Sequence, residues 1–318
     1  MKIVGTGSFL PERVAANDDL AKIVDTSDEW ISSRTGIRER RISIGDTTTD
    51  MAVKAATAAL EDAGMEAEQL DMIITATLSA DHATPSTACL VQGAIGAKKA
   101  VCFDLNAACS GFLYSLATAQ AYMKAGMAEH ILVIGVETLS KLLDLNDRST
   151  CLLFGDGAGA AIVSKDEDRN VQIVMGSDGS KGNVLTCGAQ KLHNCYYDGD
   201  KTIDTVSMDG QEVFKFAVKT VPKCVKEVLK QADQKVEDID CFLLHQANMR
   251  IIELVAKRLK VPMEKFPMNL MHCGNTSSAS IPILLDEVNK KGDLKPGDKI
   301  VLCGFGGGLT WGAIYLEW

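Results

Sequence analysis

The apolar and polar positions follow two alternating periods along most of the chain. Residues 70–77 and 131–136 are short, mostly apolar runs, which is typical of strands covered on both faces. Residues 48–64 and 112–126 instead carry apolar positions three or four residues apart, and Gly64 is placed to end the first of these helices. Strands and helices in alternation predict an α/β fold in which helices pack against sheets.

The second half of the chain repeats the pattern of the first. A charged stretch at residues 165–170 separates the two halves. Two pairs of strand starts lie 169 residues apart: Asp71 with Asp240, and Ile131 with Ile300. One shared offset favours an internal duplication, although any two α/β segments are somewhat alike. We therefore predict two α/β halves, residues 1–166 and residues 167–318.

The composition is that of a globular protein with a large core: 318 residues, 46% hydrophobic and 24% charged. The net charge of −9 disfavours binding to nucleic acid or to an anionic membrane. No apolar run is long enough for a membrane span, and the first residues lack a signal-peptide pattern, so we expect a cytoplasmic protein. The ten cysteines form no CxxC pair and mostly lie in apolar stretches, as buried thiols do in a reducing compartment.

Cys109 is placed as a nucleophile would be. It follows the strand-like residues 100–103 and precedes the helical residues 112–126. The free N–H groups and the dipole at a helix N-terminus stabilise a thiolate, which is the nucleophilic form of cysteine. A single cysteine in an apolar stretch is more often structural, so a catalytic role for Cys109 depends on which other residues lie near it.

Two further polar segments would meet Cys109 if the halves pair about a pseudo-twofold axis. The first follows an apolar strand, and the second opens the last major helix. One contains His245 and the other contains Asn275. Each has an ordinary alternative, since a lone histidine is often a core residue and Asn275 is placed to cap the last major helix. A thiol hydrolase with a Cys-His-Asn set, in which the histidine deprotonates the thiol, is a second reading of the same three residues.

Several motifs, in order along the chain, resemble the β-ketoacyl-[acyl-carrier-protein] synthase III family. They lie at residues 107–112, 154–160, 245–248, 274–277 and 304–308. The resemblance implies a thiolase-like α/β fold, in which two duplicated halves form a five-layer αβαβα sandwich, and a homodimer. It also implies an acyltransferase that condenses an acyl-CoA starter, such as acetyl-CoA, with malonyl-acyl carrier protein. The products would be 3-oxoacyl-acyl carrier protein, CO2 and CoA, at the start of fatty acid biosynthesis.

The resemblance assigns a role to each residue of the site. Cys109 would hold the acyl group in a ping-pong reaction, and the N–H groups of Cys109 and Gly307 would form the oxyanion hole. His245 and Asn275 would donate hydrogen bonds to the thioester oxygen while CO2 leaves. We expect no metal and no cofactor, because the CoA thioester is a substrate.

The family also implies a CoA site. Trp30 and Arg148 would sandwich the adenine, and Arg34 would meet the phosphates. Thr26 and Glu29 are spaced as a capping box for the helix that carries Trp30. The other predicted CoA-binding residues are Thr35, Met208, Gly210, Phe214, Ala247 and Asn248. A core tryptophan beside a solvated arginine is the ordinary alternative.

A basic stripe stands out in this acidic chain. Its lysines recur every three or four residues on one helical segment: Lys215, Lys219, Lys223, Lys226 and Lys230. Pro222 would kink or restart this helix. We predict that Lys215, Lys219, Arg250 and Lys257 dock the acidic carrier protein, with a solvated helix face as the alternative.

Thr84 falls where the family places a residue of varying size, near the acyl pocket at the dimer interface. A small side chain there would admit starters longer than acetyl. The nearest alternative function is a related condensing enzyme of secondary metabolism, whose catalytic residues would be the same. A hydroxymethylglutaryl-CoA synthase is disfavoured because no glutamate base can be placed from the sequence, and a non-catalytic carrier-binding protein is disfavoured by the complete set of catalytic residues.

Overall fold

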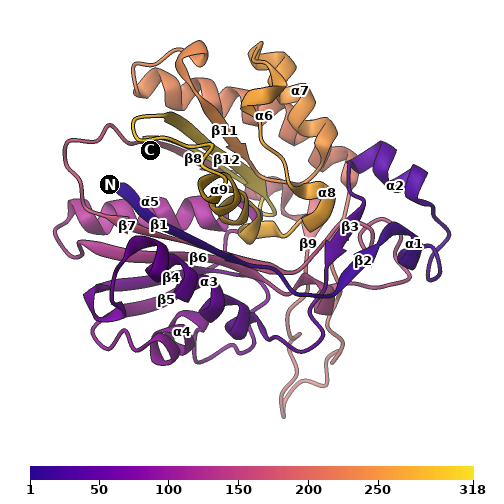
Figure 1. The fold of residues 1–318 in the computed structure, drawn as a ribbon. Helices are drawn as coiled ribbons and strands as arrows, with labels where there is room; N and C mark the ends of the chain where they lie inside the picture. Colours follow the sequence, from indigo (N-terminus) through magenta and orange to yellow (C-terminus); the bar gives the residue numbers. More distant parts are fainter.

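The computed structural model describes all 318 residues and has five layers, helix–sheet–helix–sheet–helix (Figure 1). The first sheet has the order β1-β7-β6-β4-β5, and the second has the order β11-β12-β13-β8. The strands of the first are β1 (Lys2–Phe9), β4 (Met72–Ala76), β5 (Val101–Leu105), β6 (His130–Glu137) and β7 (Gly157–Ser164). Those of the second are β8 (Gln172–Ser177), β11 (Cys241–Leu244), β12 (Lys299–Gly306) and β13 (Thr310–Glu317). The predicted αβαβα sandwich is confirmed.

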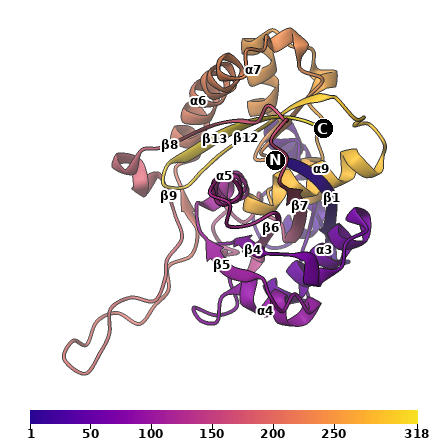
Figure 2. The same cartoon turned by 90° about the vertical axis from the view of Figure 1, so that its left-hand side faces the viewer.

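The middle layer is a pair of helices, α5 (Gly111–Lys124) and α9 (Ser280–Lys290), packed between the two sheets (Figures 1 and 2). Their buried side chains form one hydrophobic core with strands of both sheets. The outer faces are covered by α3 (Thr48–Ala63) and α4 (Thr87–Ile95) on the first sheet, and by α6 (Gly210–Gln231) and α7 (Met249–Leu259) on the second. Because helices cover both faces of each sheet, the central strands read as continuous apolar runs.

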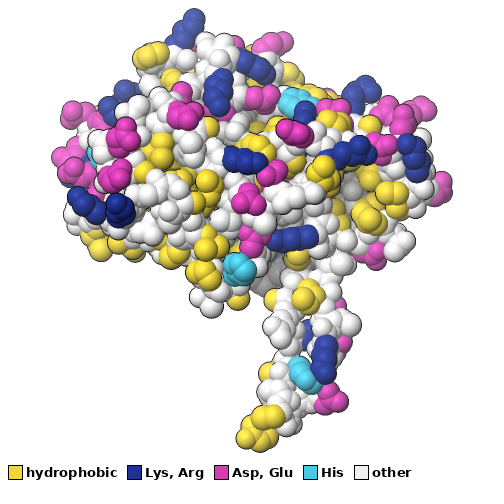
Figure 3. All heavy atoms as spheres, turned by 60° about the horizontal axis from the view of Figure 1, so that its bottom comes forward, with side chains coloured by type: hydrophobic (Ala, Val, Ile, Leu, Met, Phe, Trp, Pro, Cys, Tyr) yellow, Lys and Arg dark blue, Asp and Glu magenta, His cyan; other side chains and the backbone are white.

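Smaller elements lie around this frame. They are β2 (Val14–Ala16), α1 (Asn17–Leu20), α2 (Asp28–Thr35), β3 (Glu39–Arg41), β9 (Leu185–Thr186), β10 (Ser207–Met208) and α8 (Leu270–Cys273). Between β9 and β10 the chain makes a long arm that projects from the body (Figures 2 and 3). Tyr196, on this arm, is 96% exposed. No helix of the structure has the length and apolarity needed to cross a membrane.

The internal repeat holds across whole elements. Strands β6 (130–137) and β12 (299–306) start and end 169 residues apart, and so do the short 3-10 helices η2 (Ala108–Ser110) and η7 (Ser277–Ala279). Strands β4 and β11 begin at Met72 and Cys241, again 169 apart. The two halves therefore place equivalent turns at the same depth in the molecule.

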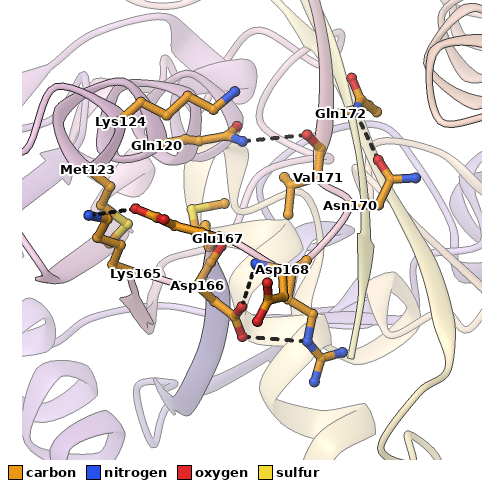
Figure 4. Close-up of a pocket in the computed structure, with 12 residues that line it drawn as sticks. Gln120, Met123, Lys124, Lys165, Asp166, Glu167, Asp168, Asn170, Val171 and Gln172 are labelled. Atoms are coloured by element: carbon orange, nitrogen blue, oxygen red, sulfur yellow. Dashed lines mark hydrogen bonds and ion pairs between the residues drawn. The ribbon is translucent and has the colours of Figure 1, made fainter.

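The charged residues 165–170 connect the first sheet to the second and line a polar hollow beside α5 (Figure 4). Lys165 pairs with Glu167 at 2.8 Å, and the side chain of Gln120 donates to Val171 O at 3.4 Å. None of the predicted site residues lines this hollow. Its polar groups mostly satisfy one another at the surface, so it carries no functional assignment.

The predicted capping box at the start of α2 is wrong. The helix begins one residue later, after Ser27, whose extended backbone (φ −149°) marks the cap. The Ser27 hydroxyl accepts a hydrogen bond from Trp30 N at 3.1 Å. Neighbouring Thr and Ser residues are both good caps, and the sequence does not separate them.

The predicted restart at Pro222 is also wrong, because α6 runs through it without a break. A proline leaves the carbonyl four residues earlier without its helical N–H donor. Here that carbonyl belongs to Val218, and it accepts instead from the Arg258 guanidinium at 2.6 Å. A side chain from α7 thus replaces the missing bond.

Gly135, in the middle of β6, tests how closely the halves approach. A Cβ at this position would lie 2.3 Å from the backbone oxygen of Ser278, which belongs to the other half. Gly135→Ala is therefore expected to lower the free energy of unfolding by about 1–3 kcal/mol or more, because backbone must move. Gly45→Ala, at an open surface position, is the control and should change it by less than about 0.5 kcal/mol in the same denaturant titration. Equal effects of the two changes would contradict the close approach.

Candidate active site

Cys109 lies in η2, between the end of β5 and the start of α5, and its side chain is buried. The preceding residue, Ala108, has a positive φ of 47°, which is uncommon for a residue with a side chain. The side-chain oxygen of Asn106 accepts a hydrogen bond from Ala108 N at 3.1 Å and supports this turn. The strained turn places the thiol at the N-terminal end of α5.

His245 directly follows β11 and is buried. Its Nδ1 lies 2.6 Å from the hydroxyl of Ser280, and the same hydroxyl accepts from Gln246 N at 3.3 Å. The Ser280 hydroxyl makes no other hydrogen bond, so a proton directed at Nδ1 satisfies both groups, which favours the tautomer with its ring proton on Nε2. Burial lowers the pKa of His245 to about 3, so the ring is neutral.

Asn275 is held in a turn like that of Asn106, which precedes it by 169 residues. Its side-chain oxygen accepts from Ser277 N at 2.9 Å, and its backbone N–H donates to Leu153 O at 2.8 Å. Ser277 has a positive φ of 50°, as Ala108 does. With its oxygen engaged, the Asn275 side chain has its two N–H groups free to face the cavity.

One tunnel brings these three side chains together. Cys109, His245 and Asn275 line it with five of the residues predicted for CoA: Met208, Gly210, Phe214, Ala247 and Asn248. Apolar residues complete the wall, among them Phe154, Leu185 and Phe305, which the sequence analysis had not assigned. The tunnel is therefore mostly apolar, with a few polar groups at the end where Cys109 lies.

A second, more apolar cavity also ends at Cys109. Its lining includes Leu78, Leu139, Leu185, Cys187, Val206, Ser277 and Gly307. It is a suitable place for an acyl chain on the sulfur, since few polar atoms line it. Thr84 is not among its lining residues and is exposed in the single chain.

The end of β12 approaches Cys109 closely. A Cβ at Gly306 would lie 2.6 Å from Cys109 N, so only glycine fits there. Gly307, the next residue, lines the acyl cavity. The backbone of this strand end and the N–H of Cys109 thus border the same small space.

The predicted CoA groove is closed in this structure. Two guanidinium groups lie over the Trp30 ring, with Arg148 Cζ 4.2 Å and Arg34 Cζ 4.5 Å from its centroid. Arg148 therefore occupies the space predicted for adenine. Thr35 is buried away from the tunnel, where its hydroxyl donates to Ile31 O at 2.7 Å.

Two family models match the chain: 3-Oxoacyl-[acyl-carrier-protein (ACP)] synthase III over residues 103–182, and its C-terminal counterpart over residues 229–318. The curated beta-ketoacyl-[acyl-carrier-protein] synthase III of Clostridium acetobutylicum is 53% identical over 100% of this chain and 98% of its own length. The chain belongs to the β-ketoacyl-[acyl-carrier-protein] synthase III family. As a member it is an acyltransferase of fatty acid biosynthesis, as the sequence predicted.

Solved structures of family members are similar to this synthase over its whole length. The 3-oxoacyl-[acyl-carrier-protein] synthase III from Aquifex aeolicus VF5 has a TM-score of 0.93 and 48% identity, covering 100% of this chain and 99% of its own. The priming beta-ketosynthase from the R1128 polyketide biosynthetic pathway has a TM-score of 0.93 and 35% identity, covering 99% and 95%. The thiolase-like fold predicted from the sequence is thereby confirmed.

The basic residues predicted for carrier docking are all exposed on the synthase, on α6 and α7. Lys215 pairs with Glu212 at 2.8 Å, and the Arg250 guanidinium donates to Ser33 O at 2.8 Å. Both lie near tunnel-lining residues, Gly210 and Asn248. Lys257 lies two turns further along α7 than Arg250, and therefore farther from the tunnel.

The resting thiol of the synthase differs from the sequence prediction. Burial raises the pKa of Cys109 to about 12. A thiolate stabilised by the helix N-terminus was expected, but desolvation of the charge outweighs that stabilisation. Cys109 is therefore a neutral thiol before substrate arrives.

Alkylation of Cys109 by iodoacetamide in the free enzyme checks this protonation state. Because only the thiolate reacts, the rate should rise about tenfold per pH unit from pH 7 to pH 9 without a plateau. Peptide mass spectrometry separates Cys109 from the exposed Cys195, which serves as an internal reference for reagent activity. A rate that levels off below pH 8 would show a stabilised thiolate instead.

Proposed function

We propose that Cys109 accepts the acyl group of an acyl-CoA and that the acyl enzyme condenses with malonyl-acyl carrier protein. The observation that carries this proposal is the neutral His245 ring, whose Nδ1 lies 2.6 Å from the Ser280 hydroxyl, a contact that favours a proton on Nε2. Together with the free amide of Asn275 it supplies two hydrogen-bond donors beside Cys109. Such a pair suits an enolate oxygen that becomes negative during the reaction.

In the first half-reaction the sulfur of Cys109 attacks the thioester carbonyl. The C–S bond to CoA breaks, and the thiol proton of Cys109 ends on the departing CoA sulfur. The backbone N–H groups of Cys109 and Gly307 would stabilise the oxyanion between these steps. Thiol and thioester exchange without a net change in bond type, so a cysteine suits the step better than a hydroxyl.

In the second half-reaction malonyl-carrier protein loses CO2, and the electron pair of the broken C–C bond forms an enolate. His245 Nε2 and Asn275 Nδ2 would donate to its oxygen. The enolate carbon then attacks the acyl carbonyl, and Cys109 leaves and regains a proton from solvent. Each donor is worth about 2.7–4 kcal/mol, because it strengthens as charge develops.

A Cys-His-Asn hydrolase fits the same residues less well. Such an enzyme needs an imidazole that removes the thiol proton. In the tautomer that the Ser280 contact favours, the Nε2 of His245 carries the proton and its Nδ1 accepts from Ser280. The histidine of this site therefore donates rather than accepts.

CoA would enter through the tunnel mouth between α2 and α7. For adenine to stack on Trp30, the Arg148 guanidinium must leave the indole face. Arg34 would then meet the phosphates as a fixed cation. The exposed residues Lys215, Lys219, Arg250 and Lys257 would dock the acidic carrier protein at the tunnel mouth and along α7.

The synthase is proposed to be a cytoplasmic homodimer. Strand β5 is the edge of the first sheet, and its Val101 is 59% exposed. An uncovered edge of this kind is a natural place for a second copy to pair. Thr84 would then approach the acyl cavity of the partner chain, which would admit starters longer than acetyl. We also propose that the chain divides into two duplicated halves, residues 1–166 and residues 167–318.

Intact-protein mass spectrometry with a panel of acyl-CoA thioesters tests the nucleophile and the starter range together. Wild-type enzyme should gain one acyl mass from acetyl-CoA and from at least one longer starter. Cys109→Ala should gain none, because the sulfur that holds the acyl group is gone. Retention of an acyl mass in Cys109→Ala would refute the nucleophile, and labelling by acetyl alone would refute the role of Thr84.

Charge reversal tests the docking surface. Lys215→Glu combined with Arg250→Glu should raise the KM for malonyl-carrier protein at least about tenfold, because favourable pairs become repulsive. The KM for acyl-CoA should change less than about twofold, since small substrates do not span this surface. Lys2→Glu combined with Lys124→Glu, two exposed lysines of the first half, is the charge-matched control. Equal changes in both KM values would contradict carrier docking here.

A further inference from the structure

A buried carboxyl lies directly behind the site and takes no part in the proposed chemistry. Glu137, the last residue of β6, has no exposed surface. Its Oε2 accepts from Ser79 Oγ at 2.5 Å and from Leu78 N at 3.2 Å. Its Oε1 lies 2.8 Å from Ser278 Oγ. No lysine or arginine pairs with it, so nothing compensates a charge on this carboxyl.

The hydrogen bonds around Ser278 indicate a proton on Glu137. The Ser278 hydroxyl has one proton but lies near two acceptors, Glu137 Oε1 at 2.8 Å and Ala76 O at 3.0 Å. Both contacts are satisfied when Glu137 Oε1 carries a proton and donates it to Ser278, which then donates to Ala76. The opposite oxygen, Oε2, already has its donors. The network thus fits a neutral carboxylic acid.

The internal repeat places this carboxyl opposite the catalytic turn. Ser278, Ala76 and Glu137 correspond, at the offset of 169, to Cys109, His245 and Gly306. In one half the strand end is Gly306, which leaves room beside the nucleophile. In the other half the strand end is Glu137, which fills the equivalent place and binds the serine that stands where the cysteine would be. The second copy of the turn is therefore structural.

We propose that Glu137 is a positioning residue that works as a neutral acid. By binding Ser278 it fixes the turn that presents Asn275, and by binding Leu78 N it fixes one wall of the acyl cavity. By staying uncharged it keeps a negative charge away from the thiol and the enolate. This inference rests on the roles proposed above for Cys109 and Asn275.

The groups that face Glu137 make its ionisation matter. The titratable neighbours are the thiols of Cys109 and Cys187, and a charge on Glu137 raises the pKa of both. Just before the adjoining strand β7, the carboxylate of Asp156 accepts from Ser43 N and Ser140 N and makes no hydrogen bond to Glu137. Burial raises the pKa of Glu137 to about 7, so the acid loses its proton near neutral pH.

Because burial raises the pKa of Glu137, the folded protein should become less stable as the pH rises. A carboxyl whose pKa is raised on folding favours the folded state most below its unfolded pKa, and this contribution falls as the pH rises through the folded value. Wild-type enzyme should therefore lose stability between pH 5 and pH 8 relative to Glu137→Gln, whose amide mimics the neutral acid. Glu129→Gln, an exposed change just before β6, should lose stability with pH in the same way as the wild type.

The decisive experiment measures condensation and thermal unfolding of wild type, Glu137→Gln and Glu129→Gln from pH 5 to pH 8.5. Between pH 6 and pH 8 the protonated fraction of a group with pKa 7 falls about tenfold. Wild type and Glu129→Gln should lose condensation rate by about that factor, and Glu137→Gln by less than about twofold. Glu137→Asp should keep the pH dependence with a lower rate, because the shorter acid cannot reach Ser79 and Ser278 together.

Identical pH profiles for wild type and Glu137→Gln, in both rate and unfolding, would overturn the proposal. If Glu137→Gln does not fold, the pH profile of Glu137→Asp decides, since a flat profile there has the same meaning. The unfolding measurement does not depend on catalysis. Acylation that persists in Cys109→Ala would thus refute the proposed function, while the pH-dependent stability of Glu137 would still be measured.

Discussion

The site depends on the close approach of two strained turns at the centre of the molecule. Both turns begin with a residue of positive φ, Ala108 in one half and Ser277 in the other. Each packs against a glycine on a strand of the first or second sheet, Gly135 beside Ser278 and Gly306 beside Cys109. The buried helices α5 and α9 that leave these turns supply the packing that offsets the strain. Without this approach, the donors of one half would not reach the nucleophile of the other.

Every reacting group in this site is neutral at rest. The thiol is protonated, the imidazole is uncharged and the third group is an amide. In the proposed reaction negative charge develops only on oxyanion and enolate oxygens, so the donors would bind it more strongly in the transition state than in the ground state. The apolar lining of the tunnel strengthens these hydrogen bonds because little water competes. The protein therefore needs orientation more than it needs fixed charge.

The sequence predicts the fold and much of the site because both depend on periodicity and on short motifs. Cys109 and His245 each follow an apolar strand, Asn275 lies just before the last major helix, and all three line one tunnel. Ser280 and Glu137 were missed, since their roles arise from contacts between residues far apart in the chain, which no local pattern shows. The same is true of Arg258, which compensates for Pro222 from another helix. The closed contact of Arg148 on Trp30 depends on side-chain conformation alone.

The stacking of Arg148 on Trp30 affects how ligands bind to and leave the indole face. Arg148 is an internal competitor for the indole face, because any planar ligand must first displace it. The apparent affinity for such a ligand is lower than the intrinsic one by the fraction of time that the face is open. The same competition assists departure, since the guanidinium returns to the ring as the ligand leaves. The proposed reaction in two halves would gain from this, because the first product would have to leave the tunnel before the second substrate could enter.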